Sequence, residues 1–223
     1  MPESIALGRR AAAEALGTAL LLATVVGSGI MGERLFPGNA GLALLANSLA
    51  TGAGLAALIL ALGTISGAHF NPLVTAADAA GGGRHWREVP VYAAAQVAGA
   101  FAGVAAAHAM FGEPLFSISH RARSGPALAL AEAIATLGLL VVILGSGARG
   151  PSASAFAVGS YIAAAYWFTS STSFANPAVT LARAASDSFV GIRPHDVPGF
   201  LGGQLLGAAA AISLFRWLTR KVT

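Results

Sequence analysis

The apolar residues of the chain fall into six long blocks separated by short polar turns. Each block runs for about 20 residues, the length that an α-helix needs to cross the hydrocarbon core of a bilayer. Turn signals such as "FPGN" at 36–39 and "GSGARGP" at 145–151 separate the blocks. The pattern therefore predicts six membrane-spanning helices, at residues 10–31, 39–63, 89–111, 126–146, 152–169 and 197–218.

Two shorter segments between these blocks each contain an Asn-Pro pair. They are "AHFNPLVTAADA" at 68–79 and "SFANPAVTLAR" at 173–183. Asn is a favoured helix N-cap, and Pro is favoured at the first helical position, so short helices are expected over Asn71–Ala80 and Asn176–Ala185. Ten helical residues extend about 15 Å, roughly half the hydrocarbon thickness. Two such half-helices placed end to end would make one composite span.

The chain contains an internal repeat. Three ordered pairs of segments match: 13–18 with 131–136, 71–79 with 176–184, and 96–103 with 203–210. The chain is therefore expected to form one domain of two repeats, at about 1–112 and 113–223. Because each half has three spans, an odd number, the halves must lie in opposite orientations. Inverted repeats with half-helices are typical of a transport site near the bilayer midplane.

The two Asn-Pro pairs have a specific chemistry. The side-chain oxygen of Asn71 or Asn176 can cap its own helix, which leaves the amide NH₂ group free to point elsewhere. If the two half-helices meet at the midplane, both amides and both positive helix ends face one lumen. Water could accept hydrogen bonds there, whereas a cation or hydronium ion would be repelled. The simpler alternative, that both Asn residues only cap buried helices, is disfavoured by the inverted duplicate.

Composition supports a membrane protein and excludes other classes. Charged residues make up only 10% of the chain, against about a quarter in soluble domains. Cys is absent, which excludes disulfides and thiolate metal sites. The sequence contains no catalytic triad, HExxH or phosphate-binding loop, so we expect no enzyme, metal or cofactor. The net charge of +4 comes from scattered helix ends, so nucleic acid is not an expected partner.

The distribution of Lys and Arg predicts the orientation. Six spans put both termini on one side, and that side carries eight of the 13 Lys and Arg residues, against five on the other. The positive-inside rule therefore favours cytoplasmic termini, in the inner membrane. The first apolar block, 11–30, is too long for a signal-peptide core and contains Glu14, so it is expected to be a retained span.

With these features, the chain resembles the aquaporin, or major intrinsic protein, family. The resemblance covers essentially the whole chain and rests on "SGAHFNPLVT", "SFANPAVT", the paired Glu14 and Glu132, and a Gln opening spans three and six. It implies an all-α membrane protein with six transmembrane helices and two re-entrant half-helices. It also implies one pore per subunit, a homotetramer in the lipid bilayer, and passive conduction without a cofactor.

The Asn-Pro motifs carry over as pore residues: Asn71, Pro72, Leu73, Asn176, Pro177 and Ala178. Leu73 departs from the usual family pattern and is expected to change packing only. A second departure is larger, because the Arg that usually follows the second motif is replaced by Val179. The family's outer constriction then corresponds to Thr51, Ser173, Val179 and, if the loop before the motif has no gap, Ala164. This ring is expected to be wide and uncharged.

A wide filter without Arg resembles a bacterial subgroup associated with arsenic-resistance genes. The resemblance implies permeation of neutral trivalent arsenic hydroxides such as arsenite, including methylated forms, together with water and polyols. The Asp that follows the filter Arg in glycerol facilitators is also missing, so ordinary glycerol specialisation is not indicated. A general water or small-solute channel is the alternative. A secondary active transporter is less favoured, because the midplane carries only Asn and Pro.

Four other polar residues need separate interpretation. Glu14 and Glu132 are costly within a membrane span, and hydrogen bonds that hold the re-entrant loops are favoured over proton relays. His69 either lines the inner pore mouth or makes a structural hydrogen bond to its loop. Arg183 either places a displaced cation in the outer vestibule or binds the carbonyls at a helix C-terminus. The second interpretation of Arg183 is favoured.

Overall fold

The computed structural model describes residues 5–220 and contains helices with no strand among these residues. Lys221, one of the basic residues counted above, lies outside them. Six helices are long: α1 Leu7–Leu35, α2 Ala40–Ser66, α4 Val89–Phe111, α5 Pro126–Ser146, α6 Pro151–Phe168 and α8 Val197–Leu218. Two are short: α3 Pro72–Ala80 and α7 Pro177–Arg183. Single 3₁₀ turns, Trp86–Glu88, Gly147–Arg149 and Pro194–Asp196, precede α4, α6 and α8. The six predicted spans are therefore all found as long helices, with bounds within a few residues of those expected.

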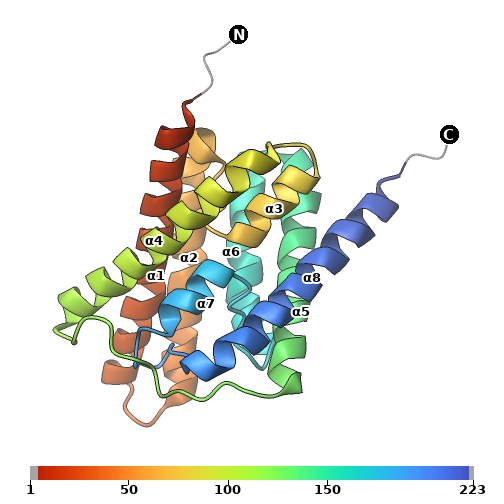
Figure 1. Ribbon diagram of the computed structural model, residues 1–223. Helices are drawn as coiled ribbons and strands as arrows, with labels where there is room; N and C mark the ends of the chain where they lie inside the picture. Colours follow the sequence, from red (N-terminus) through yellow and green to blue (C-terminus); the bar gives the residue numbers. More distant parts are fainter. Residues whose placement is uncertain (1–4, 221–223) are drawn as a thin grey trace.

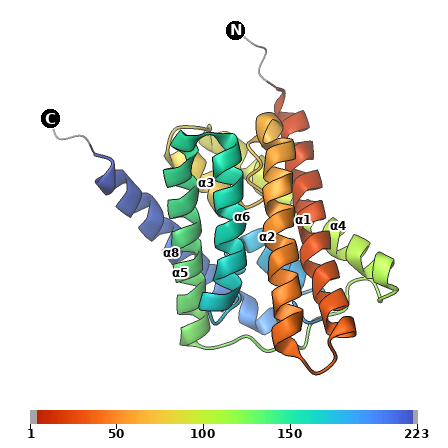
Figure 2. The ribbon, with the colours of Figure 1, turned by 180° about the vertical axis from the view of Figure 1, so that it is seen from behind.

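The long helices surround the two short ones. α1 packs along α4, α5 packs along α8, and α2 contacts both α1 and α6. α3 and α7 lie one above the other inside this arrangement (Figure 1). The start of α1 and the end of α8 lie at the same end of the bundle, which Figure 2 shows from behind. This is the arrangement expected of an even number of spans.

The outer surface of the bundle is apolar. Five of the long helices have the length and hydropathy of a membrane span, and α6, with 18 residues and three Ser, is not among them. Leucines such as Leu16, Leu130 and Leu206 are more than half exposed on the outer faces. Buried polar side chains, by contrast, gather in the interior. This inside-out distribution suits a helical protein whose solvent is lipid.

The half-helices begin where the sequence predicts. The side-chain oxygen of Asn71 accepts from the Leu73 N–H at 2.9 Å, and that of Asn176 accepts from the Ala178 N–H at 3.0 Å. The second half-helix ends at Arg183, two residues before the predicted end at Ala185. The chain turns there because the N–H of Ala184 bonds to the carbonyl three residues back instead of four.

Glycines bring the paired helices close together at equivalent places in the two halves. Four of them face a neighbouring backbone: Gly99, Gly103, Gly203 and Gly207. A Cβ atom added at any of the four would lie 2.2 Å from a carbonyl oxygen of the facing helix, which belongs to Ala15, Ala19, Ala129 and Ala133 respectively. The close approach of α1 to α4 and of α5 to α8 therefore requires these glycines.

Two adjacent glycines of α8 give a matched test of this contact. Gly203→Ala is expected to destabilise the protein by about 1–3 kcal/mol, because the new methyl group must displace the backbone of α5. Gly202 has no atom within 4 Å of an added Cβ, so Gly202→Ala should be neutral or slightly stabilising. Thermal unfolding of both variants in detergent checks the difference. Equal midpoints would show that the backbones are not in close contact.

Candidate functional site

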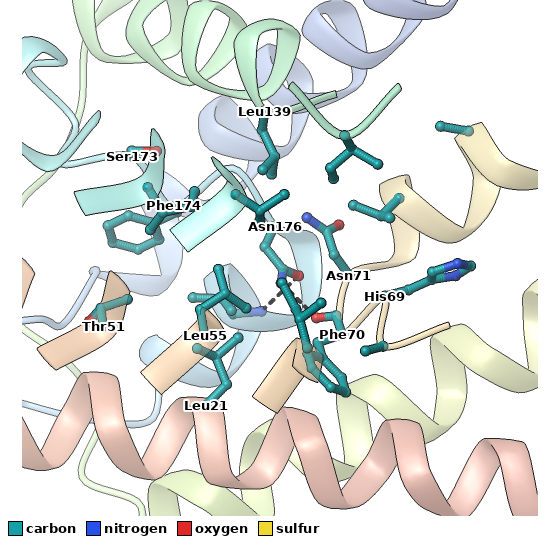
Figure 3. Close-up of a pocket in the computed structure, with 18 of the residues that line it drawn as sticks. Leu21, Thr51, Leu55, His69, Phe70, Asn71, Leu139, Ser173, Phe174 and Asn176 are labelled. Carbon is teal, nitrogen blue, oxygen red and sulfur yellow. Dashed lines mark hydrogen bonds between the residues drawn. The ribbon is translucent and has the colours of Figure 1, made fainter. Parts of the chain in front are cut away.

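A cavity of about 200 Å³ lies in the interior, lined by residues of α1, α2, α5 and α6, the two half-helices and the loops that precede them. His69 lies toward one end of it, Ser173 and Phe174 lie toward the other, and Asn71 and Asn176 lie between (Figure 3). Asp78, which also lines the cavity, lies 3.6 Å from His69, and Arg183 stacks on Phe174. Leu21, Leu55 and Leu139 supply apolar wall on the remaining sides. The cavity therefore combines a mostly apolar wall with a few polar groups at its middle and ends.

The two Asn residues are tied to each other's loops. Nδ2 of Asn71 donates to the carbonyl oxygen of Ala175 at 2.7 Å, and Nδ2 of Asn176 donates to that of Phe70 at 2.8 Å. One N–H of each amide is thus used to join the half-helices, which differs from the expectation of a wholly free NH₂ group. The second N–H of each amide is available to the cavity, which both residues line.

The other motif residues support the helix starts and do not line the cavity. Pro72 and Pro177 occupy the first helical positions. Leu73 and Ala178 are buried, and Leu73 packs in an apolar cluster that includes Leu140 of α5. Leu73 therefore has the packing role expected of it.

The loops that lead into the two half-helices share an unusual backbone. Ala68 and Phe70 before the first Asn, and Ser173 and Ala175 before the second, all have φ near 49°. A non-Gly residue in this left-handed region costs on the order of 1 kcal/mol or more, so the loops must be held from outside.

Buried carboxylates hold these loops. Oε1 and Oε2 of Glu14 accept from the backbone N–H groups of His69 and Phe70 at 2.9 and 2.7 Å. The two oxygens of Glu132 accept from those of Phe174 and Ala175 at 2.9 and 2.8 Å. Both glutamates are fully buried. These contacts match the interpretation that the two glutamates hold the re-entrant loops. Neither glutamate lines the cavity.

A glutamine adds a further hydrogen bond to each of the two glutamates. Nε2 of Gln96 donates to Glu14 and to Thr75 Oγ1, and Nε2 of Gln204 donates to Glu132 and to Thr180 Oγ1. Each threonine in turn donates to the carbonyl of its own Asn. The same contacts thus recur in both halves of the chain.

The structure corrects one residue of the expected constriction. Thr51, Ser173 and Val179 line the cavity, but Ala164 is exposed on the outer face of α6. Ile162 and Tyr166 face inward instead, and the Tyr166 hydroxyl donates to Thr51 Oγ1 at 3.2 Å. Residue 164 lies two positions from each, about 200° around the helix, so it cannot share their face. Counting back from Asn176 without a gap therefore chose the wrong residue.

His69 both lines the cavity and makes structural contacts. Its Nδ1 lies 3.1 Å from Thr75 Oγ1, and its Nε2 lies 3.6 Å from a carboxylate oxygen of Asp78. Arg84 approaches the same carboxylate and donates to the Ser66 carbonyl. The two interpretations of His69 from the sequence are therefore compatible with each other.

Arg183 does not make the contacts with its own helix C-terminus that the favoured interpretation predicts. It is buried, lines the cavity, and donates from Nε to the carbonyl of Val190 in the following loop, not to the last carbonyls of its own helix. Its guanidinium carbon lies 3.3 Å from the centroid of the Phe174 ring. Phe174 and Tyr166 also line the cavity, and sequence reasoning missed both. The i, i+4 pair of Ile162 and Tyr166 is the signal that could have found the second.

Metal ligands do not gather in this region. Within residues 5–220, no group of three or more His, Asp or Glu side chains could hold a metal ion.

Comparisons with known proteins now identify the family. Residues 1–151 match the family model described as major intrinsic protein. The chain belongs to the major intrinsic protein family. It is 53% identical over 212 residues to aquaglyceroporin AqpS of Rhizobium meliloti (strain 1021), covering 95% of this chain and 91% of that protein. It is 36% identical to aquaporin NIP2-3 of Zea mays, over 91% of this chain and 68% of that protein.

A solved structure supports the fold. The crystal structure of the aquaglyceroporin from Plasmodium falciparum superposes with a TM-score of 0.75, covering 94% of this chain and 96% of that one, at 22% identity. The all-α, aquaporin-like fold is thereby confirmed. Major intrinsic proteins are passive channels and not enzymes, so this chain is a multi-pass membrane channel protein for small neutral solutes such as water or glycerol.

The buried carboxylate of Glu132 gives a testable consequence for the loops. Glu132→Gln replaces one accepting oxygen by an NH₂ group, which cannot accept from the Phe174 or Ala175 N–H. We expect a loss of about 1–3 kcal/mol in the free energy of unfolding, because a buried donor loses its partner. Thermal unfolding in detergent and water flux in proteoliposomes measure the effect.

Glu113→Gln is the matched control. Glu113 is an exposed residue that pairs with Arg34 at 2.8 Å, and a surface ion pair of this kind is worth little. It should leave both the unfolding midpoint and the water flux nearly unchanged. If the two variants behaved alike, Glu132 would not be holding the pore loop.

Proposed function

We propose that the chain conducts small neutral hydroxylated solutes, including trivalent arsenic hydroxides such as arsenite, together with water and glycerol-like polyols. The single observation that carries the proposal is Val179 on the cavity wall, at the motif position where the family usually has Arg. Val179 leaves this position apolar and uncharged. A solute bulkier than water gains room there, and the methyl group of a methylated arsenical would have an apolar surface to contact.

Hydroxyl groups supply the polar contacts of the proposed constriction. The Thr51 hydroxyl and the Tyr166 hydroxyl are hydrogen-bonded to each other, and Ser173 Oγ is buried with no partner among the described residues. These groups can exchange hydrogen bonds with the hydroxyl groups of a passing solute. Arsenous acid is uncharged at neutral pH and similar in size to a polyol, so it suits a wall that is part apolar and part hydroxyl. Tyr166 makes the ring narrower than the Thr, Ser, Val and Ala ring expected from the sequence.

The alternative is a general water or small-solute channel in which arsenite has no special place. The apolar walls formed by Leu21, Leu55 and Leu139 favour this alternative, because they offer no site for one particular solute. A secondary active transporter is less supported, since the middle of the cavity carries amides and no ionised side chain.

Assembly and orientation are part of the same proposal. We propose a homotetramer in the inner membrane with both termini in the cytoplasm, and two inverted repeats at about 1–112 and 113–223. The eight-to-five distribution of Lys and Arg supports the orientation. The recurrence of the Glu, Gln, Thr and Asn contacts in the two halves supports the repeat.

Flux measurements on one reconstituted preparation test the substrate. Proteoliposomes should take up water, glycerol and arsenite faster than protein-free vesicles, and the rates should not depend on a proton or sodium gradient. Water flux without arsenite flux above the lipid background would contradict the arsenic proposal and favour the general channel. Uptake that requires an ion gradient would indicate a transporter instead.

A substitution at Val179 tests the observation on which the proposal rests. Val179→Arg should lower arsenite and glycerol flux by about tenfold or more, the change that an added barrier of ~1.4 kcal/mol produces, because a long side chain enters the constriction. Water flux should fall less, since water is smaller.

Val179→Met separates size from charge in the same assay. It adds an unbranched apolar side chain and should reduce arsenite flux only modestly. Both variants must elute as a single species in detergent, so that a loss of flux is not a loss of folding. Unchanged arsenite flux in a folded Val179→Arg variant would mean that residue 179 does not set solute size.

A further inference from the structure

Arg183 is a buried cation with unsatisfied donors beside the cavity. Its side chain is only 2% exposed, and among the described residues only Nε has a protein acceptor, the carbonyl oxygen of Val190. No carboxylate oxygen of the described residues lies within ion-pair distance of it. A buried charge without such partners is costly. The two terminal amino groups therefore have the cavity, which Arg183 lines, as their source of hydrogen-bond acceptors.

The aromatic ring of Phe174 fixes the plane of this guanidinium. The ring stacks against Arg183 at 3.3 Å, and the ring of Phe200 supports it edge-on at a centroid distance of 4.8 Å. Phe174 also lines the cavity, next to Ser173 (Figure 3). Stacking of this kind holds an arginine flat on an aromatic face and leaves its edge free to donate.

A second arginine makes this region more positive. Arg123 lies 5.2 Å from the centroid of the same ring, and its N–H groups donate to the carbonyls of Ser171, Phe189 and Gly191. Burial lowers the pKa of Arg123 to about 10, so it stays charged at neutral pH. Arg123 does not line the cavity. Its hydrogen bonds hold the loops around Phe174, whereas Arg183 faces the lumen.

We propose that Arg183 is the cation-excluding, hydrogen-bond-donating member of the constriction in this chain. It lies four residues after Val179, one turn further along the same face of α7, and both residues line the cavity. Its amino groups donate to the oxygen atoms of neutral solutes, while its charge repels protonated and other cationic species. The inference rests on the proposed function, because it assigns a selectivity residue to the same pore.

The position explains how an apolar, uncharged residue at position 179 can coexist with selectivity against ions. A charge displaced by one turn leaves the width at Val179 open to a bulky solute and still acts on the same path. A unit charge about 5 Å from a permeating cation, at an effective dielectric constant near 20, slows that cation by on the order of a hundredfold. Other barriers in the pore remain, so removal of Arg183 should expose only part of this factor.

The test uses proteoliposomes of the full chain with two readouts. Water permeability is measured by light scattering after an osmotic step, and proton influx is measured with an internal pH dye under a potassium diffusion potential. Arg183→Met, which keeps an unbranched side chain and removes the charge, should raise proton influx at least about tenfold, and water permeability above the lipid background shows that the variant has folded. Arg183→Lys keeps the charge and should stay close to the unmodified protein in proton influx.

Arg121→Met is the matched control. Arg121 is an exposed arginine that packs on Phe189 and does not line the cavity. Arg121→Met also removes one positive charge, from the loop between α4 and α5, and should change neither readout. If Arg183→Met fails to fold, Arg183→Gln, whose amide can still donate to the Val190 carbonyl, is judged by the same criterion.

The outcomes separate this inference from the proposed function. Equal proton influx in Arg183→Met and Arg121→Met, with water flux intact, would overturn the role of Arg183 and leave the channel proposal standing. An unmodified protein that conducts neither water nor glycerol above the lipid background would overturn both. A rise in proton influx confined to the neutral variants at position 183 supports the assignment.

Discussion

The carboxylates of Glu14 and Glu132 are buried in the bundle, and each accepts hydrogen bonds from two consecutive backbone N–H groups of a loop that enters a half-helix. Burying a charge in a membrane protein is costly unless its lone pairs are satisfied. Here the loops supply the partners, and the glutamates in turn hold backbone that non-Gly residues rarely adopt. Each carboxylate and its loop thus stabilise each other, and the pore depends on these hydrogen bonds.

The loops place the two half-helices end to end. Once the residues before each Asn are fixed, each amide reaches the carbonyl of the opposite loop, so the two half-helix starts are joined by two hydrogen bonds of 2.7 and 2.8 Å. The remaining amide donors face a lumen with mostly apolar walls. Solutes therefore meet few polar groups, each in a defined position, which suits rapid passage of neutral molecules and not tight binding.

The end of the cavity beside α7 departs from the usual pattern of the family but keeps polar groups on its wall. Val179 supplies an apolar wall, Tyr166 and Thr51 supply hydroxyl groups, and Arg183 supplies a charge one turn away. Phe174, stacked on Arg183, belongs to the Asn-Pro motif region itself. With the proposed role of Arg183, selectivity in this chain extends over a longer stretch of the pore than a single ring.

The sequence by itself determined the helices, the half-helix starts and the role of the buried glutamates in holding the loops. Those features depend on local signals, such as apolar length, Asn-Pro caps and a repeated Glu, Gln and Asn, which act within a few residues or recur in both halves. Only the tertiary structure decided that Tyr166 and not Ala164 faces the lumen, and that Arg183 turns away from its own helix end. The first depends on the rotation of α6 about its own axis. The number of residues in the loop before Asn176 does not reveal that rotation. The second depends on Phe174 and Val190, which reach Arg183 only when the chain folds back on itself.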